Sequence, residues 1–243
     1  MTFDLAVFLA GAFVAAYVTG VAGFAFGIVA AAIWLHALTP IQATTLIVAY
    51  ALIVQGYAVW KLRRAINVRR LLPFVLGSAV GIPAGIAVLN WASASDLRVA
   101  VGLLIVLFSL YNLIAPSMPH VKRAGPALDA AAGVMNGLLG GATGLAGIVL
   151  VIWCAVRGWT REEQRAVFQP AAVATFLMTI MWLGGAGVLT ADVARLFLIG
   201  LPALIAGTWL GWKSYGRLDE AAFRKVVLGV LVVLGTTLVA SSR

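Results

Sequence analysis

The sequence predicts an all-α, polytopic membrane protein made of two inverted repeats, each a re-entrant or broken helical hairpin followed by three transmembrane helices. Three observations support this. The chain is 63% hydrophobic and only 10% charged, it contains apolar stretches of membrane-spanning length, and glycine-rich runs interrupt it at two corresponding places. A soluble domain carries about 25% charged residues. Because so few charges cannot cover a water-soluble surface, we expect lipid to cover most of the outside.

Six stretches have the length and composition of simple membrane-spanning helices, which need about 20 apolar residues each. They lie near residues 41–60, 71–90, 98–115, 166–189, 193–212 and 221–241. Tryptophan marks an end of several of these stretches, as expected for side chains that settle at the membrane interface. The examples are Trp60, Trp91 and Trp212.

Two further apolar stretches, residues 3–37 and 127–156, do not fit as single spans. The run TGVAGFAFG interrupts the first and GLLGGATGLAG interrupts the second. Glycine lowers helix stability and favours a break. If the helix breaks there, most arms have about 13–17 residues, or roughly 20–25 Å, which is short for a span. This length favours a hairpin that enters and leaves the membrane on one side.

The two halves carry similar motifs in the same order: a glycine break, an Ile-Trp pair, and a second full span rich in small residues. The glycines Gly20, Gly23 and Gly27 are echoed by Gly141, Gly144 and Gly147. We therefore divide the chain into a first repeat at 1–118, a cytoplasmic linker at 119–126 and a second repeat at 127–243.

The basic residues choose between two topologies. If both broken segments are re-entrant and the N-terminus lies outside, the loops at 61–70, 116–127, 157–165 and 213–225 face the cytoplasm. These loops hold fourteen of the 17 Lys and Arg residues. If all eight segments are ordinary spans, nine basic residues lie inside and eight outside, which gives no bias. Cytoplasmic loops carry an excess of Lys and Arg, so the hairpin topology is favoured. A model with long, kinked spans is the alternative.

The glycine breaks are the main candidate binding site. A helix that begins after a break presents unpaired N–H groups and a positive dipole end, and glycine lets an anion approach the backbone. The alternative is close helix packing through small residues. Two breaks in corresponding places favour a site. The candidates are Thr19, Gly20, Gly23, Phe24, Gly27, Asn136, Gly140, Gly141, Thr143 and Gly144.

Polar residues in the span after each break extend this candidate site. In the first half they are Gln42, Thr45 and Gln55, and in the second half they are Arg165 and Gln169. Arg165 is the cation best placed to meet an anion, although an ordinary loop arginine is an equal alternative. Buried amides such as Gln169 need hydrogen-bond partners, which is why we single them out.

Residue types that catalysis or metal binding would need are sparse. The eight carboxylates lie in termini, loops or segment ends, and no HExxH, CxxC or Walker motif occurs. We therefore expect no enzyme activity, no cofactor and no metal. We also expect no nucleic-acid partner, because the net charge of +9 comes from short loop clusters. Asp4 and Asp129, near the starts of the broken segments, are the nearest candidates for a coupling role.

The order and duplication of these motifs resemble the sulfite exporter TauE/SafE family, also called the toluene sulfonate uptake permease family. In the second half the similar stretch is GLLGGATGLAGIVLVIWCAVRGWTREEQRAVFQP, and in the first half it is TGVAGFAFGIVAAAIW. The resemblance implies a multi-pass carrier of a prokaryotic inner membrane for sulfur-containing anions such as sulfite, sulfonates and sulfoacetate. The family's glycine motifs fall on the glycines named above, with Phe24 and Phe26 where many members have further glycines.

These observations together predict a secondary transporter that moves a small sulfur-containing or organic anion by alternating access. The two hairpin tips are expected to meet near the middle of the membrane. The alternatives are an anion channel of the same fold and a membrane assembly subunit that does not itself transport. The partners expected are the small anion and membrane lipid, and a homo-oligomer is left open.

Overall fold

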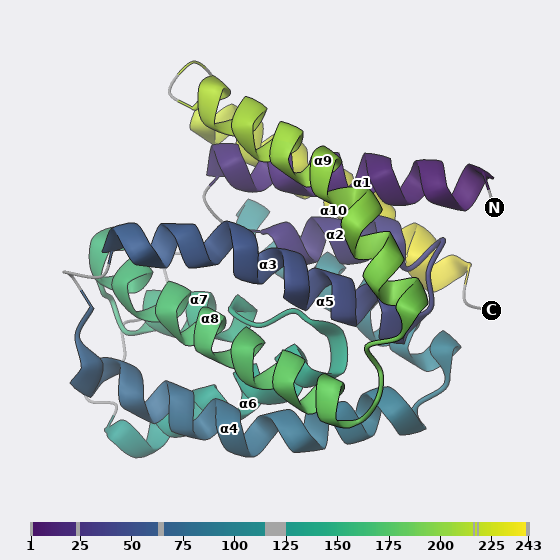
Figure 1. Ribbon diagram of the computed structural model, residues 1–243. Helices are drawn as coiled ribbons and strands as arrows, with labels where there is room; N and C mark the ends of the chain where they lie inside the picture. Colours follow the sequence, from purple (N-terminus) through teal and green to yellow (C-terminus); the bar gives the residue numbers. More distant parts are fainter. Residues whose placement is uncertain are drawn as a thin grey trace. The chain divides into compact units, whose positions relative to one another are not determined.

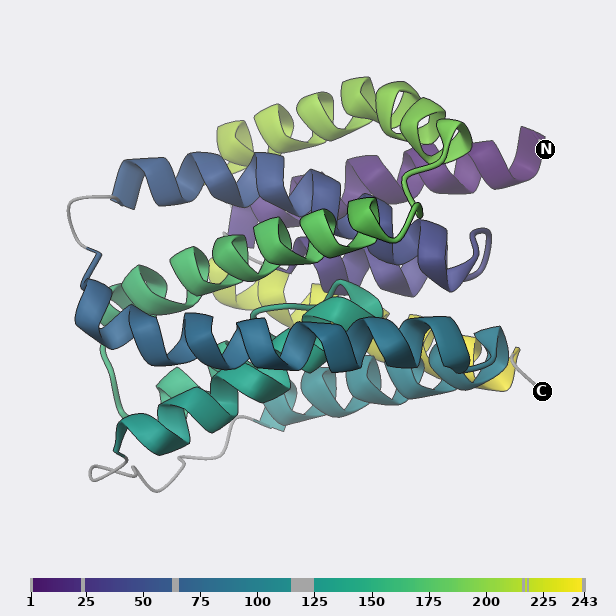
Figure 2. The same ribbon diagram turned by 60° about the horizontal axis from the view of Figure 1, so that its bottom comes forward.

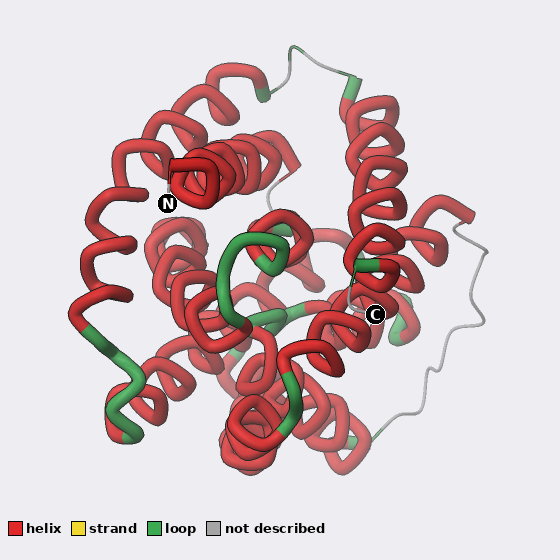
Figure 3. The backbone as a smooth tube through the Cα atoms, turned by 90° about the vertical axis from the view of Figure 1, so that its right-hand side faces the viewer, coloured by secondary structure: helices red, strands yellow, loops and turns green. Residues whose placement is uncertain are grey.

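The computed structural model describes residues 2–22, 25–62, 66–114, 125–215, 217 and 219–241. Within these residues the protein consists of helices joined by loops, with no strand, which confirms the predicted all-α class (Figure 3). The helices are α1 (Thr2–Ala22), α2 (Phe26–Trp34), α3 (Pro40–Leu62), α4 (Val68–Trp91), α5 (Ala94–Ile114), α6 (Pro126–Thr143), α7 (Ile148–Val156), α8 (Arg161–Gly185), α9 (Ala191–Ser214) and α10 (Glu220–Ala240).

Seven helices in the described part of the chain are long and apolar enough to cross a membrane. Six of them, α3, α4, α5, α8, α9 and α10, cover the six predicted spans. The seventh is the stretch Asp4–Ala22 of α1, which the sequence indicated only as one arm of a broken segment. The protein is therefore a polytopic membrane protein, as its composition predicted.

The expected lengths of the hairpin arms are wrong. The arms are unequal: α1 has 21 residues and α2 only 9, while α6 has 18 and α7 has 9. The helix continues through Gly20 in the first segment and through Gly141 in the second, because those glycines pack against neighbouring helices instead of breaking the chain. Both breaks lie within the predicted glycine-rich runs, towards their C-terminal ends.

In each hairpin a tryptophan on the short arm (α2 or α7) holds that arm against the long arm (α1 or α6). The indole Nε1 of Trp34, on α2, donates a hydrogen bond to the Phe8 carbonyl oxygen of α1 at 3.0 Å. The indole Nε1 of Trp153, on α7, donates to Asp129 Oδ1 of α6 at 2.7 Å. Both broken segments are therefore helical hairpins, each closed by the tryptophan of its Ile-Trp pair.

The chain forms two compact units and passes between them four times, the first time within α3 after Ile47. Unit 1 contains α1, α2, α5, α9 and α10. Within it α1 lies beside α9 and α5 beside α10 (Figure 1). Small residues allow both approaches: a Cβ placed on Gly20 would lie 2.9 Å from the Gly211 Cα, and one on Gly102 would lie 2.8 Å from the Gly235 carbonyl oxygen.

Unit 2 contains α4, α6, α7 and α8, and its central feature is the pairing of α4 with α6 (Figure 2). Each of these two helices carries three glycines spaced four residues apart, so that they lie on one face. A Cβ on any of them would collide with backbone of the other helix. Backbones that approach this closely gain van der Waals contact inside a membrane. The glycines are Gly77, Gly81 and Gly85 on α4, and Gly133, Gly137 and Gly141 on α6.

The two units each combine elements from both halves of the sequence. In unit 1 the long arm of the first hairpin, α1, packs on α9, the second of the three spans that follow the hairpin in the second half. In unit 2 the long arm of the second hairpin, α6, packs on α4, the second of the three spans that follow the hairpin in the first half. Each hairpin thus packs against the corresponding helix of the opposite half. The repeat boundaries at 118 and 127, and the inverted relation of the halves, stay predictions.

Candidate functional site

The second break lies between α6 and α7, and glycines with left-handed backbone build it. Gly144 ends α6 with φ 73°, and its N–H donates to the Gly140 carbonyl oxygen at 2.9 Å. Gly147 precedes α7 with φ 104°. Side chains rarely tolerate these angles, which glycine adopts readily. The chain therefore reverses direction within the four residues 144–147.

Asn136, two turns before the break on α6, holds this reversal in place. Its side-chain oxygen Oδ1 accepts a hydrogen bond from the Gly147 N–H at 2.6 Å. Its Nδ2 donates to Ser78 Oγ of α4 at 3.1 Å and to Thr175 Oγ1 of α8 at 3.0 Å. One fully buried amide thus ties together the break and the two helices beside it.

The hydroxyl groups around Asn136 complete this network. Ser78 Oγ donates onward to the Gly133 carbonyl oxygen at 3.0 Å, and Thr175 Oγ1 donates to the Ala171 carbonyl oxygen at 2.8 Å. Both hydroxyls therefore use their single proton elsewhere and accept from Asn136 with their oxygen. A buried amide without partners would cost about 1–3 kcal/mol, so the network fixes one orientation of Asn136.

The first break has a similar short helix but a different residue at its start. Ala25 precedes α2 with φ 84° and ψ 5°, and it is the one non-glycine residue with positive φ in the described part of the chain. A left-handed alanine costs roughly 1–2 kcal/mol. Strain of this kind gathers at functional sites, where the surrounding structure holds it in place.

Neither short helix has a side-chain cap at its N-terminal end. The N-cap residues are Ala25 for α2 and Gly147 for α7, and no side chain caps either position. A helix leaves its first N–H groups without partners inside the helix. These groups carry a partial positive charge, and so an uncapped start within the protein is suited to binding an anion.

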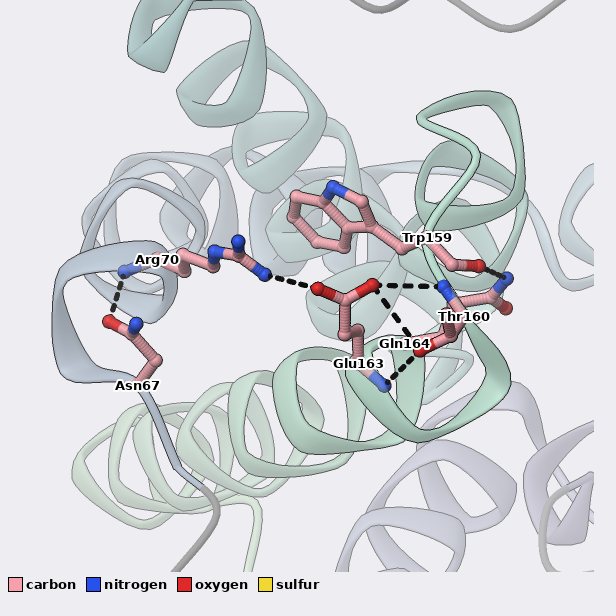
Figure 4. A network of polar contacts seen from close by, with 6 residues as sticks. All are labelled: Asn67, Arg70, Trp159, Thr160, Glu163 and Gln164. Atoms are coloured by element: carbon pink, nitrogen blue, oxygen red, sulfur yellow. Dashed lines mark hydrogen bonds and ion pairs between the residues drawn. The ribbon is translucent and has the colours of Figure 1, made fainter.

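A polar network joins the start of α4 to the start of α8 (Figure 4). The guanidinium of Arg70 forms an ion pair with Glu163 at 3.0 Å and lies 5.5 Å from the ring centre of Trp159. Glu163 also closes a capping box with Thr160, whose hydroxyl accepts from the Glu163 N–H at 3.3 Å. This cap makes α8 begin at Arg161, five residues before the predicted span.

Two contacts bring helix ends together, and they bear on the predicted topology. The Arg70–Glu163 ion pair brings the start of α4 to the start of α8 in unit 2. In unit 1, Arg224 Nη2 donates to Asn112 Oδ1 at 2.6 Å, which brings the C-terminal end of α5 to the start of α10. If every segment were an ordinary span, the two helix ends in each pair would lie on opposite sides of the membrane. Both contacts fit the hairpin topology.

Comparison with known proteins agrees with this architecture. The model of the family described as "Sulfite exporter TauE/SafE" matches residues 7–238, nearly the whole chain. The chain belongs to the sulfite exporter TauE/SafE family. It is therefore a multi-pass membrane transporter and not an enzyme, and a bacterial inner membrane fits as its location.

One curated relative supports the same assignment. The chain is 26% identical over 176 residues to a protein of Cupriavidus necator named "Probable sulfite/organosulfonate exporter TauE". The matched region covers 71% of this chain and 68% of the relative. No solved structure matches the chain.

The predicted residues of the first half take several roles in this TauE/SafE family member. Thr19 is buried, and its hydroxyl donates to the Ala15 carbonyl oxygen at 2.7 Å in the last turns of α1. Gly20 faces α9, where it serves the close packing described above. Gly27 lies in the first turn of α2. Gly23 and Phe24 lie outside the described residues.

The polar residues of α3 include a helix cap. The Gln42 side chain accepts from the Thr39 N–H at 3.2 Å, and the Thr39 hydroxyl accepts from the Gln42 N–H at 3.3 Å. This reciprocal pair satisfies the start of α3. Thr45 is buried and donates to the Ile41 carbonyl oxygen at 2.8 Å. Gln55 lies in the C-terminal half of α3 and is partly exposed.

In the second half, the predicted residues gather around the break. A Cβ on Gly140 would lie 2.9 Å from Thr175 Cγ2, so this glycine makes room beside the Asn136 network. Thr143 donates to the Leu139 carbonyl oxygen at 2.7 Å and accepts from the Leu145 N–H at 3.3 Å. Gly141 packs on α4 instead.

The two predicted polar residues of α8 lie in different surroundings. Gln169 is buried, 5% exposed, whereas Arg165 is exposed near the start of the helix. The sequence analysis missed Ser78 as a partner of Asn136. It is an ordinary serine within an apolar span, and only the packing of α4 on α6 brings it to the site.

Proposed function

We propose that this protein is a secondary transporter that moves a small sulfur-containing or organic anion across the bacterial inner membrane by alternating access. The observation that carries the proposal is the Asn136–Gly147 hydrogen bond, which holds the uncapped start of α7 in one geometry. An oxyanion such as sulfite or a sulfonate presents acceptor oxygens that suit backbone N–H donors. The name of the Cupriavidus necator relative, a probable sulfite/organosulfonate exporter, supports the same class of substrate.

The chemistry of the second break fits an oxyanion better than a cation or a neutral molecule. The first N–H groups of α7 point away from its helical body and carry partial positive charge. Gly144 and Gly147 have no side chain that would keep a ligand from the backbone. Thr143, at the end of α6, and Gln169, on α8, are buried polar residues that could offer further polar groups.

Not every predicted site residue belongs in this proposal. Gly20 and Gly141 pack against helices, and Gln42 caps α3, so we assign these three structural roles. The proposed site of the second break consists of Asn136, Gly140, Thr143, Gly144 and Gln169. Arg165 adds positive charge at the exposed start of α8, where an anion approaching from the cytoplasm would meet it.

In this proposal, movement of the hairpins produces alternating access. Each short arm has 9 residues and is fastened to its long arm by a tryptophan hydrogen bond, so it is a small rigid body between two breaks in the chain. Broken helices within repeated halves are a recurrent transporter design. The two same-side contacts, Arg70–Glu163 and Arg224–Asn112, support the topology in which the halves are inverted.

Binding of the purified wild-type protein tests the substrate class. Ligand binding raises the apparent melting temperature, so sulfite, methanesulfonate and acetate are compared at matched ionic strength. We expect sulfite or methanesulfonate to stabilise the protein, with acetate weaker. If none of these anions shifts the melting temperature or enters liposomes that contain the protein, the proposed function is wrong.

Transport by variants tests the site. Asn136→Ala removes the acceptor for the Gly147 N–H and the two donor hydrogens of the amide, so we expect uptake in liposomes to fall about 5- to 150-fold, from a loss of about 1–3 kcal/mol. Asn112→Ala, which removes an asparagine hydrogen bond in unit 1, is the matched control and should retain uptake. Flux that saturates and depends steeply on temperature indicates a carrier, whereas non-saturating flux indicates a channel of the same fold.

A further inference from the structure

Thr179, on α8, carries a buried hydroxyl to which the proposed function gives no role. Its side chain is 0% exposed, and among the residues that the structure describes its Oγ1 has no hydrogen-bond partner. A buried hydroxyl without a partner destabilises the fold, because it has lost its hydrogen bonds to water and gained none within the protein. Native proteins contain few such groups, so this one calls for a reason.

Other buried threonines show the hydrogen bond that Thr179 does not make. Four of them donate to the carbonyl oxygen four residues earlier in their own helix, at 2.7 or 2.8 Å: Thr19, Thr45, Thr143 and Thr175. Thr179 lies well inside α8, which continues to Gly185, but its hydroxyl has no such bond. The hydroxyl proton is therefore available to a group outside its own helix.

Thr179 lies on the face of α8 that packs against the second break. On this face, the Ala172 Cβ would lie 3.6 Å from a Cβ placed on Gly147, and Thr175 Oγ1 accepts the hydrogen bond of Asn136 at 3.0 Å. Thr179 comes seven residues after Ala172 and four after Thr175. At 3.6 residues per turn, it points within about 40° of both, towards the second hairpin.

The tip of the second hairpin reaches the level of Thr179 along α8. Helices α6 and α8 run in the same direction, since both contribute to one buried cluster near their starts, and further along Gly140 of α6 faces Thr175 of α8. About one turn beyond this pair, α6 ends at Thr143 and α8 reaches Thr179. The unpartnered hydroxyl is therefore beside the break and not further down the bundle.

The short helix α7 directs its first N–H groups towards the same level. It runs back from the break: at its end the Trp153 indole donates to Asp129 Oδ1 at 2.7 Å, and Arg157 Nη2 lies 3.6 Å from Asp129 Oδ2, in the first turn of α6. Backbone N–H groups point towards the N-terminal end of their helix. Those of the first turn of α7 therefore point away from Asp129 and towards the level of Thr179.

We infer that Thr179 is a side-chain donor of the anion site, so that an oxyanion at the uncapped start of α7 also accepts a hydrogen bond from Thr179 Oγ1. This inference rests on the proposed function and adds a residue to its site. A hydroxyl suits a carrier, because burying a neutral donor costs far less than burying a charge once the anion has left. The missing partner of Thr179 is then the transported anion.

The variant Thr179→Val tests this inference, because valine has nearly the shape of threonine and lacks the hydroxyl. Without ligand, we expect its apparent melting temperature to equal or exceed that of wild type, since an unpartnered buried hydroxyl is removed. Isothermal titration calorimetry with sulfite and methanesulfonate, at matched ionic strength, should instead show dissociation constants raised about 10- to 150-fold, the loss of one hydrogen bond to a charged group.

The matched control is Thr208→Val on α9 in unit 1. Its Oγ1 is likewise buried without a hydrogen-bond partner among the described residues. The same substitution there should keep or raise the melting temperature and leave both dissociation constants unchanged. A second pair, Thr179→Ser and Thr179→Ala, differs only in the hydroxyl, so the serine variant should bind both anions more tightly than the alanine variant.

Each outcome decides the inference. If Thr179→Val binds both anions as tightly as wild type, or if Thr208→Val weakens binding equally, Thr179 is not an anion contact and the proposed function stands. If wild-type protein binds neither anion, the proposed function and this inference are both wrong. If Thr179→Val does not fold, the comparison of Thr179→Ser with Thr179→Ala decides, and equal affinities of those two variants would overturn the inference.

Discussion

The side chain of Trp34 lies in a slot on α1 that Gly11 keeps open, and its indole N–H donates to the Phe8 carbonyl oxygen at 3.0 Å. A Cβ on Gly11 would lie 2.5 Å from the Trp34 Nε1. The tryptophan is fully buried, and it also makes ring contacts with Phe8 and Phe26. This arrangement fastens the first hairpin without any charged group.

Replacing this tryptophan should loosen the first hairpin. We expect Trp34→Phe to destabilise the protein by about 1–3 kcal/mol, because the hydrogen bond and part of a tightly packed ring are lost. The measurement is the apparent melting temperature of the purified protein in detergent. Trp209→Phe, at a position that is 60% exposed, is the control. Equal effects at the two positions would show that the Trp34 contact does not stabilise the fold.

The glycine face of α4 should tolerate no side chain. Gly81→Ala would push a methyl group against the Val134 carbonyl oxygen of α6, which is backbone and cannot rotate away. We expect a loss of about 1–3 kcal/mol, the usual cost of overpacking. At Gly229 of α10 nothing lies within 4 Å of an added Cβ, so Gly229→Ala should be neutral or stabilising by up to about 1 kcal/mol. Thermal unfolding of both variants checks this contrast.

Glycine in place of Ala25 should relieve the backbone strain at the start of α2. Ala25→Gly removes the cost of a left-handed alanine, so we expect stabilisation of about 1 kcal/mol, measured as a higher apparent melting temperature. Ala30→Gly, inside the same helix, should instead destabilise by a similar amount. If Ala25→Gly also slows anion transport, the strain serves function and not only the turn.

Labelling of introduced cysteines with a membrane-impermeant thiol reagent should report the topology. In a background where Cys154 is replaced by Ala, we expect Asn67→Cys and Arg165→Cys to react from the same, cytoplasmic side. Asn90→Cys, near the other end of α4, should react from the opposite side. Labelling of Asn67→Cys and Arg165→Cys from opposite sides would contradict the Arg70–Glu163 contact and the hairpin topology.

Much of the fold could be predicted from the sequence, since the length and hydropathy of a span follow from the thickness of the bilayer. The presence of two breaks was also predicted, because glycine weakens helices. The exact break points were not. Gly20 and Gly144 look alike in sequence, but Gly20 lies against α9 whereas Gly144 adopts φ 73°. Whether a glycine packs against a helix or breaks one depends on the helix that lies beside it. The sequence around the glycine does not show which helix that is.

The candidate site was predicted in part for the same reason. Asn136 stood out as a polar residue near a break, and the structure places it at the centre of the network. Ser78 and Arg157 did not stand out, because their partners lie 58 and 28 positions away in the sequence. Contacts of that kind are set by tertiary packing, as in the pairing of α4 with α6.

The packing of α1 on α9 has a consequence for synthesis of the protein. The face of α1 that packs on α9 leaves the ribosome early, but its partner helix begins only at Ala191. At about 5–20 residues per second, α1 waits on the order of 10–30 s in the membrane before α9 arrives. The first 118 residues alone would therefore leave this face of α1 without its partner helix. Co-expression of the two halves as separate chains should restore the folded protein, which neither half forms by itself.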